Sequence, residues 1–414
     1  MESRLDELMD VFGAVCVEGV KGCGKTWMSH SRVNSAINIA DPTNNFFNRT
    51  MVSMDVYYAF NGDLPRLIDE WQEFPSLWDA TKIKVDESVE KGRFILTGSS
   101  TPETKGIYHS GVARIGTLKV RTMSLFESGD SNGSVSLASM FDGEQLMIPQ
   151  DPVSMNDLIY LSIRGGWPQT IGMSAKQAKE FYDSYLDLSI SDVRRVDGVE
   201  RDVAKLKAFL KSLARNESTT ATDVTISRDI EESEESICVS NQTVVSYRDV
   251  FTRMFLIEDV PAYSPDLRSS ARVGKTSKRH LTDPARVVSL LDATPEKLSA
   301  DLRLFGYVFE SLCVRDLGIY ASVLKGKLFH YRDGRGREID AVIELSDGRW
   351  GAFEIKTGMD KVEDACKKLL NLKKFFVDNG WSAPTVLCVI CGTCPVAHRR
   401  PDGVYVVPIT SLRP

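Results

Sequence analysis

The chain has 414 residues, of which 42% are hydrophobic and 26% are charged, and this composition excludes a chain that is disordered throughout. At roughly 150 residues per domain, the length predicts about two to four domains. The 51 basic and 57 acidic residues give a net charge of −6, so any contact with nucleic acid has to come from a local basic patch. We find no signal peptide and no run of about 18 apolar residues, and eight cysteines do not make a disulfide scaffold in a chain of this length. We therefore expect a cytoplasmic protein with reduced thiols and no membrane partner.

Residues 1–127 show apolar strands that alternate with helical segments, a pattern typical of a parallel sheet with helices on both faces. The first 13 residues predict a short amphipathic helix. Apolar strands are expected at residues 12–19, 63–71 and 92–100. Residues 128–152 are rich in glycine, serine and aspartate and predict an inserted loop. Residues 153–200 predict helices that are interrupted by the Gly-Gly-Trp-Pro motif at 165–168.

Three helices are expected between residues 203 and 260. The first covers 203–216, the second lies near 221–230, and the third begins after Ser240, which is a suitable N-cap. The acidic stretch 229–235 is expected to be a solvated loop. This pattern is that of a winged helix-turn-helix, and a plain three-helix lid explains it equally well.

The clearest basic segment lies at residues 268–279 and contains five cations without an internal acidic residue: Arg268, Arg272, Lys275, Lys278 and Arg279. The helix at 240–254 offers two arginines but also Asp249, and it follows the acidic stretch. We therefore expect the basic segment, rather than that helix, to be the main electrostatic contact with DNA.

A phosphate-binding loop is indicated at residues 19–26, where Gly19, Gly22, Gly24, Lys25 and Thr26 belong to the pattern G-x-x-x-x-G-K-[ST]. The loop follows an apolar strand and precedes a helical segment, which is the context that this motif requires. Its glycines and backbone N–H groups would surround a phosphate. Lys25 would reach the β- and γ-phosphates, and the hydroxyl of Thr26 would hold Mg²⁺.

Two carboxylates at the end of the next expected strand are candidates for hydrolysis. Asp69 fits the acid on the magnesium side, and Glu70 fits the base that orients the attacking water. Ser99, at the end of the third strand, is the candidate polar group beside the γ-phosphate, with Thr97 as the second choice. Arg114 is either an arginine finger that reaches the nucleotide of a neighbouring subunit or an ordinary surface arginine.

A second acidic constellation lies in the C-terminal α/β unit, residues 298–414. We expect a helix at 298–317, a hairpin formed by 327–345 and 349–356, a helix at 359–378 and strands at 384–391 and 403–408. The loop Ser346-Asp347-Gly348 is a suitable hairpin turn, and pairing of 345 with 349 places Asp340 opposite Glu354 and Glu338 opposite Lys356.

Two opposed carboxylates repel each other, so this register predicts a site for Mg²⁺ or Mn²⁺ between Asp340 and Glu354. Glu310, on the preceding helix, is a further candidate ligand, and Lys356 could orient a water molecule or stabilise developing charge. An exposed polar face with a Glu338–Lys356 pair explains the same spacing equally well.

Three cysteines and a histidine near the C-terminus have a spacing that a tetrahedral zinc site can use: Cys388, Cys391, Cys394 and His398. Cys388 and Cys391 lie in an apolar strand that would send them to opposite faces. We therefore prefer buried thiols in the last core strands.

In their order along the chain, GVKGCGKT, LIDEW, GRFILTGSS, GGWP and EID…FEIK resemble a widespread prokaryotic family of AAA+-type ATPases with a C-terminal PD-(D/E)XK nuclease-like domain. The resemblance covers nearly the whole chain. It implies an α/β protein with a RecA/AAA+-like P-loop ATPase core, a helical lid, a winged-helix segment and a restriction-endonuclease-like C-terminal domain. We place these parts at residues 1–150, 151–202, 203–284 and 285–414.

Matched position by position, the resemblance implies nucleotide binding, hydrolysis and a nuclease-like set of residues. The residues matched to nucleotide binding are Gly19, Gly24, Lys25 and Thr26, and those matched to hydrolysis are Asp69 and Glu70. Arg114 matches the family's arginine. The nuclease-like set corresponds to Glu310, Asp340, Glu354 and Lys356. The chain departs from the family pattern in the longer segment 128–152 and in the acidic stretch 229–235, which lies near the expected DNA-binding wing.

Three functions follow as hypotheses. The first is an ATPase that acts on or near DNA and carries a Mg²⁺-dependent nuclease-like domain. The second is a nucleotide-driven switch whose C-terminal domain is a non-catalytic module that binds DNA or protein. The third is a nucleotide kinase, which predicts no downstream acidic hairpin and ranks last. ATP and Mg²⁺ are the expected cofactors, with Mn²⁺ as an alternative at the C-terminal site, and DNA and a second copy of the chain are candidate partners.

Overall fold

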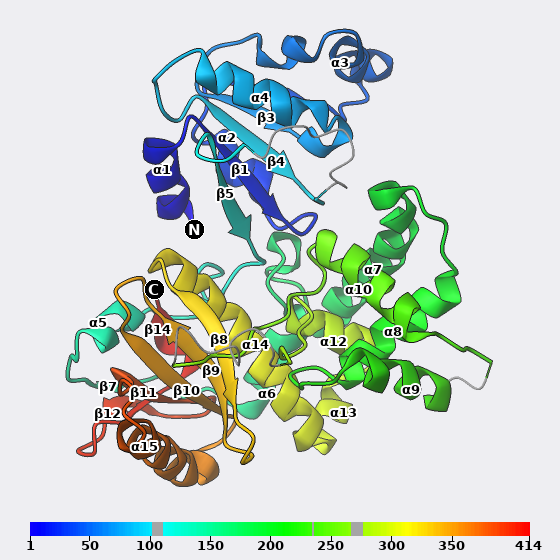
Figure 1. Ribbon diagram of the computed structural model, residues 1–414. Coiled ribbons are helices and arrows are strands. Elements are labelled where there is room, and N and C mark those ends of the chain that lie inside the picture. Colours follow the sequence, from blue (N-terminus) through cyan, green and yellow to red (C-terminus); the bar gives the residue numbers. More distant parts are fainter. Residues whose placement is uncertain (102–110, 234–235, 266–275) are drawn as a thin grey trace. The chain divides into compact units, whose positions relative to one another are not determined.

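The computed structural model describes residues 1–101, 111–233, 236–265 and 276–414 (Figure 1). The chain divides into two compact units, which we describe separately. Unit 1 combines Met1–Thr122, Asp192–Arg201 and Arg248–Leu256, and unit 2 combines Met123–Ser191, Asp202–Tyr247 and Ile257–Pro414. These units do not follow the four predicted domain boundaries one by one, so those boundaries stay a prediction. Among the described residues, no helix has the length and apolar character that a bilayer crossing needs.

Unit 1 is built on a five-stranded sheet with the order β2-β3-β4-β1-β5, in which every neighbouring pair is parallel. Its strands are β1 (Ala14–Gly19), β2 (Ser35–Asn38), β3 (Arg66–Asp69), β4 (Phe94–Gly98) and β5 (Ile115–Val120). Its helices are α1 (Glu2–Val11), α2 (Lys25–His30), α3 (Thr43–Met54) and α4 (Ser76–Asp86), with short 3-10 turns η1 (Val56–Phe60) and η2 (Trp71–Glu73). The three strands expected from the sequence are present, and the predicted parallel sheet is confirmed.

Apolar side chains explain why this sheet forms. Strand β1 is buried along nearly its whole length, as expected for a parallel strand covered on both faces. A core of buried residues from the sheet and the surrounding helices includes Cys16, Ile68, Leu77 and Leu96. Because all five strands run in the same direction, their carboxyl ends meet at one edge of the sheet, and that edge receives the residues of the predicted nucleotide site.

Unit 2 contains a mixed seven-stranded sheet with the order β7-β12-β13-β11-β10-β9-β8. Its strands are β7 (Met147–Pro149), β8 (Lys327–Arg332), β9 (Glu338–Glu344), β10 (Trp350–Lys356), β11 (Val386–Cys391), β12 (Val396–Arg399) and β13 (Tyr405–Val407), and β6 (Val135–Ser136) pairs separately with β14 (Leu412–Arg413). Helix α14 (Leu302–Val323) packs against β8, β9 and β10, and α15 (Val362–Asp378) packs against β10 and β11. The other helices are α5 (Leu137–Phe141), α6 (Met155–Arg164), α7 (Ala175–Asp197), α8 (Val203–Arg215), α9 (Asp223–Ser233), α10 (Asn241–Arg253), α12 (Pro284–Leu290) and α13 (Pro295–Ala300), of which α7 and α10 extend into unit 1.

Two local expectations for unit 2 are wrong. The expected loop at 128–152 contains β6, α5 and β7, because β7 pairs with β12 and completes the C-terminal sheet. The expected single strand at 327–345 is split into β8 and β9 by a turn in which the Asp333 carboxylate accepts the backbone N–H groups of Arg335 and Arg337.

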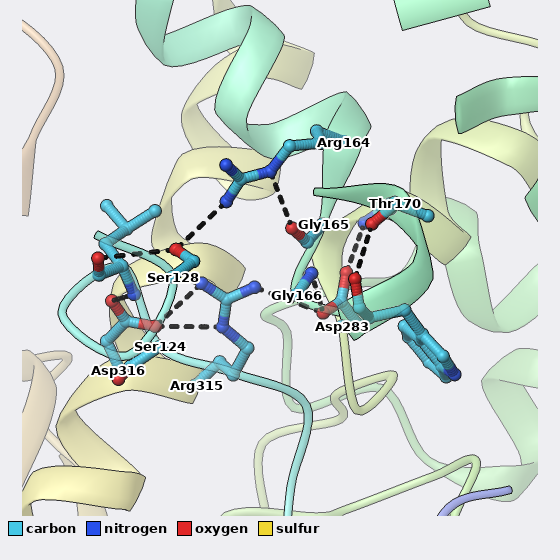
Figure 2. Close-up of polar contacts among 12 residues, drawn as sticks. Ser124, Ser128, Arg164, Gly165, Gly166, Thr170, Asp283, Arg315 and Asp316 are labelled. Atoms are coloured by element: carbon cyan, nitrogen blue, oxygen red, sulfur yellow. Dashed lines mark hydrogen bonds and ion pairs between the residues drawn. The ribbon is translucent and has the colours of Figure 1, made fainter. Parts of the chain in front are cut away.

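The Gly-Gly-Trp-Pro motif after α6 packs against a buried network of charged side chains (Figure 2). Arg315 donates to Asp283 at 3.1 Å and to Asp316 at 2.8 Å, and the N–H of Gly166 donates to Asp283 at 3.0 Å. A Cβ atom on Gly166 would lie 2.2 Å from the carbonyl oxygen of Met123, so a side chain has no room there. The motif is therefore part of the core of unit 2.

Helices α8, α9 and α10 confirm the three expected helices, and Ser240 accepts the N–H of Thr243 as a helix cap does. The acidic stretch is not a loop over its described part, because α9 extends to Ser233. Within this helix, Asp229 accepts hydrogen bonds from Nε and Nη2 of Arg215. After α10, Val260 and Lys278 exchange backbone hydrogen bonds of 2.9 Å, and Arg279 bridges to Thr219. Two antiparallel segments thus follow the helices, and the second of them also bridges to Thr219, which lies between α8 and α9.

Candidate functional site

The loop between β1 and α2 has the backbone that a phosphate-binding loop requires. Gly22 and Gly24 have φ angles of 77° and 100°, a region that favours glycine. The Lys25 side chain is buried, and its Nζ donates to the carbonyl oxygens of Gly19 at 2.8 Å and Val20 at 2.9 Å. The ammonium group is therefore held inside the loop, where phosphate oxygens could replace the two carbonyls.

Thr26, Asp69 and Thr97 meet at the carboxyl edge of the sheet. Asp69 ends β3 and lies beside Thr97 of β4 in the parallel register. Asp69 Oδ1 accepts the hydroxyl of Thr26 at 3.0 Å and also the hydroxyl of Thr97. The carboxylate is buried, so the two hydroxyls replace water as its hydrogen-bond donors.

Glu70 follows Asp69 in a left-handed conformation with φ 60°, a strained geometry that tends to occur at functional sites. Its Oε2 accepts the hydroxyl of Ser99 at 3.1 Å and the side-chain amide of Gln72. The same amide lies 3.3 Å from Ser99 Oγ. The sequence analysis named Glu70 and Ser99 but missed Gln72, because nothing in the sequence indicates that the 3-10 turn η2 returns it to Glu70.

The residues at this edge fit a magnesium nucleotide. Mg²⁺ prefers oxygen ligands, and in P-loop proteins a Ser or Thr of the loop and an acid on a neighbouring strand supply them. Thr26 Oγ1 and Asp69 Oδ1 lie 3.0 Å apart and belong to these two positions.

Arg114 lies at the other end of the sheet. Strand β5 begins at Ile115, which pairs with Ala14 at the start of β1, and the Arg114 side chain forms an ion pair with Asp86 at 2.7 Å. It is therefore placed away from the nucleotide edge of its own subunit, and a role at a neighbour's nucleotide stays a prediction.

In unit 2, the predicted hairpin register is confirmed next to the turn, but the predicted pairs Asp340–Glu354 and Glu338–Lys356 lie outside the ladder. Leu345 N–H donates to Arg349 at 2.8 Å, and the pairs run from Glu344–Trp350 to Ala341–Phe353. The ladder ends there, and the Asp340 carboxylate accepts the N–H of Ile355 at 2.8 Å instead.

Four carboxylates and three lysines then form what we call the acidic cluster: Glu310, Glu338, Asp340, Glu354, Lys278, Lys356 and Lys368. Lys356 Nζ lies 3.3 Å from Asp340 and 2.9 Å from Glu354, as the alternation of the strand predicts. Lys368 of α15 contacts Glu354 at 2.7 Å. Lys278 Nζ lies 2.5 Å from Glu310, 3.4 Å from Glu338 and 4.0 Å from Asp340.

Charges in the cluster follow from burial and from these contacts. Burial raises the pKa of Glu310 to about 7, although Lys278 opposes the shift. Burial would also raise the pKa of Asp340, but Lys356 and Lys278 hold it below its usual value. The pKa of Glu354 is raised by burial and by Asp340. Carboxylates raise the pKa of Lys278 against the effect of its burial.

The predicted metal site at Glu310, Asp340 and Glu354 does not fit this geometry. Ammonium groups, rather than a gap between carboxylates, separate the acids. Within the described ranges, no group of three or more His, Cys, Asp or Glu side chains is arranged to hold a metal ion.

The predicted DNA contact at 268–279 is wrong for its last two cations. Lys278 is 2% exposed and belongs to the acidic cluster. Arg279 is buried too, and it binds Asp259, Asp223 and the carbonyl oxygen of Ala221. The remaining three cations, Arg268, Arg272 and Lys275, lie outside the described residues.

The C-terminal cysteines are free and buried, as preferred from the sequence. A hydrogen bond from Cys391 lowers the pKa of Cys394 to about 6. His398 Nδ1 faces the carbonyl oxygen of Val396 at 2.9 Å.

Three family models match the chain: an AAA domain at residues 12–128, a domain of unknown function (DUF8612) at 155–297 and a second domain of unknown function (DUF4143) at 305–412. The uncharacterized proteins Rv2008c of Mycobacterium tuberculosis and Mb2031c of Mycobacterium bovis are each 23% identical over 357 residues, which cover 86% of this chain and 72% of the relative.

Two solved structures are distantly similar. The Walker-type ATPase PABY2304 of Pyrococcus abyssi has 10% identity, a TM-score of 0.43 and coverage of 70% of this chain and 94% of its own. The ORC2 protein of Aeropyrum pernix has 12% identity, a TM-score of 0.29 and coverage of 72% and 92%.

The comparisons support one part of the resemblance and not the other. The nuclease-like identity of the C-terminal domain has no support, because its match is to a domain of unknown function. The AAA match spans the parallel sheet, the phosphate loop and the acids Asp69 and Glu70. Residues 12–128 are therefore a P-loop AAA ATPase domain.

Proposed function

We propose that this protein hydrolyses ATP with Mg²⁺, using Glu70 as the base. The observation that carries the proposal is that two carboxylates, each held by hydrogen bonds, lie at the same edge of the sheet. Thr26 and Thr97 hold Asp69, and Ser99 and Gln72 hold Glu70.

Each residue has a distinct task in this proposal. Lys25 binds the β- and γ-phosphates once its contacts to the loop carbonyls are exchanged for phosphate oxygens. Thr26 and Asp69 would hold Mg²⁺, which neutralises negative charge on the phosphates. Glu70 accepts a proton from the attacking water, and Ser99 and Gln72 fix the direction of its carboxylate.

Turnover of the Glu70→Gln variant tests this assignment. The amide cannot accept the proton, so we expect ATP binding to persist and steady-state hydrolysis to fall by about 10²–10⁴-fold. Glu73→Gln is the matched control, because Glu73 lies three residues away and forms only a partly exposed ion pair with Arg49. Wild-type turnover in Glu70→Gln would refute the role of Glu70 as the base.

We further propose that the ATPase acts on or near DNA through a winged-helix-like segment. The support is the order of elements along the chain: helices α8 to α10, then the antiparallel segments around Val260 and Lys278, with Thr219 as a third bridge. Because Lys278 and Arg279 are buried in ion pairs, the candidates for phosphate contact reduce to Arg268, Arg272 and Lys275.

Salt dependence tests the DNA proposal. Each phosphate contact contributes about one unit to the slope of log K against log salt. Reversing the charges of Arg268, Arg272 and Lys275 should flatten this slope and weaken binding to any sequence alike. Arg332→Glu is the control, because this arginine contacts Thr220 and lies outside the basic segment. An unchanged slope after the triple reversal would refute the contact.

A further inference from the structure

The acidic cluster raises the question of what balances its charge. Four carboxylates converge from α14, β9 and β10, and isolated buried carboxylates are costly. A divalent cation is one solution, and it is the solution that the sequence predicts. Lys278, whose position in the cluster the sequence did not reveal, supplies another.

The ammonium group of Lys278 lies where a cation shared by Glu310, Glu338 and Asp340 would lie, while Glu354 contacts Lys356 and Lys368. Its Nζ is 2.5 Å from Glu310, 3.4 Å from Glu338 and 4.0 Å from Asp340. Its side chain is only 2% exposed, so water competes little for these contacts. Mg²⁺ or Mn²⁺ would need the same carboxylate oxygens at about 2.1 Å, which is incompatible with an ammonium group among them.

The charge balance also disfavours an additional metal. Four carboxylates face the ammonium groups of Lys278, Lys356 and Lys368. A divalent cation added to this set would make the cluster positive and would repel the lysines in a low-dielectric interior.

Backbone hydrogen bonds fix the position of Lys278. Its N–H and C=O both pair with Val260 at 2.9 Å, and the next residue, Arg279, is held by Asp259 and Asp223. The ammonium group therefore comes from an anchored segment, in contrast to a flexible surface lysine.

We infer that Lys278 is the built-in cation of the acidic cluster, and that it makes the C-terminal domain a metal-independent module in place of a metal-dependent nuclease. This inference concerns unit 2 and does not depend on the proposed ATPase mechanism.

The test measures Mn²⁺ binding to the full-length chain by calorimetry and by thermal unfolding, without nucleotide. We compare the wild type, Asp340→Asn, Lys278→Met, and Lys278→Met with Asp340→Asn. We expect Asp340→Asn to leave the Mn²⁺ response of the wild type unchanged. Lys278→Met should bind Mn²⁺ about tenfold or more tightly than the wild type, because the variant lacks the charge that repels the ion, and the added Asp340→Asn should remove that gain. Lys367→Met is the control, since this lysine is 63% exposed and pairs with exposed Asp364.

Two results would overturn the inference. One is Mn²⁺ binding by the wild type that Asp340→Asn abolishes, because the carboxylates would then hold metal beside Lys278. This measurement needs only the wild type and Asp340→Asn, so it decides the question even if Lys278→Met fails to fold. The other is a folded Lys278→Met variant that binds Mn²⁺ no better than the wild type.

Discussion

Arg315 should be among the most sensitive single positions for the stability of unit 2, and Arg315→Met tests this expectation. The guanidinium group joins Asp283 and Asp316 (Figure 2). All three side chains are at most 2% exposed. Burial already raises the pKa of Asp316 although Arg315 opposes the shift. Methionine keeps much of the side-chain volume but leaves two buried carboxylates without their cation.

The expected loss of stability in Arg315→Met depends on the hydrogen-bond partners that the two carboxylates keep. Asp283 keeps the N–H groups of Gly166 and Ala285, both at 3.0 Å, and Asp316 keeps the N–H of Leu125 at 2.9 Å. Breaking one side of a buried ion pair costs about 3–5 kcal/mol, which corresponds to a fall in Tm of roughly 6–20 °C for a unit of this size.

Urea unfolding followed by circular dichroism measures the loss, and hydrogen exchange at the N–H groups of Gly166 and Leu125 locates it. Arg349→Met is the matched control, because Arg349 is 41% exposed and pairs with the exposed side chains of Asp142 and Asp347. We expect the control to change the free energy of unfolding by about 0.5 kcal/mol or less. A loss below about 1 kcal/mol in Arg315→Met, with unchanged exchange at Gly166, would refute the argument.

Two other predictions concern Arg114 and Cys394. If Arg114 acts on the nucleotide of a neighbouring subunit, mixing Arg114→Ala with Lys25→Ala subunits should restore ATPase activity that neither variant shows alone. Full activity of Arg114→Ala by itself would show that Arg114 is an ordinary surface arginine. The hydrogen bond from Cys391 should keep Cys394 a thiolate down to a pH of about 6, which gives absorbance at 240 nm that Cys394→Ser lacks. If the thiol of Cys391 is the cause, Cys391→Ser should change the pH at which Cys394 titrates. An unchanged titration of Cys394 would rule that cause out.

The sequence predicted features that depend on neighbours along the chain. The strand before Gly19, the strand that ends at Asp69 and the hairpin around Asp347 follow from apolar runs and turn residues. The same local register brought Lys356 to Asp340 and Glu354. Alternation along a strand and pairing across a short turn are both set by a few consecutive residues.

Features that depend on distant segments were missed or misjudged. Lys278 belongs to a basic run in the sequence, but its burial depends on pairing with Val260 and on acids from α14 and β9. Strand β7 is three residues long, and its partner β12 lies more than two hundred residues away. Arg114 was matched to the family's arginine by its position in the sequence, whereas the end of the sheet that it occupies depends on where β5 begins.

The fate of ATP bound to Glu70→Gln tests the central claim most directly. Purified protein is mixed with a substoichiometric amount of labelled ATP and Mg²⁺, quenched with acid at intervals, and the nucleotide is separated. We predict that the wild type converts the label to ADP, that Glu70→Gln retains it as bound ATP, and that Lys25→Ala binds it weakly. Conversion to ADP by Glu70→Gln at the wild-type rate would contradict the account.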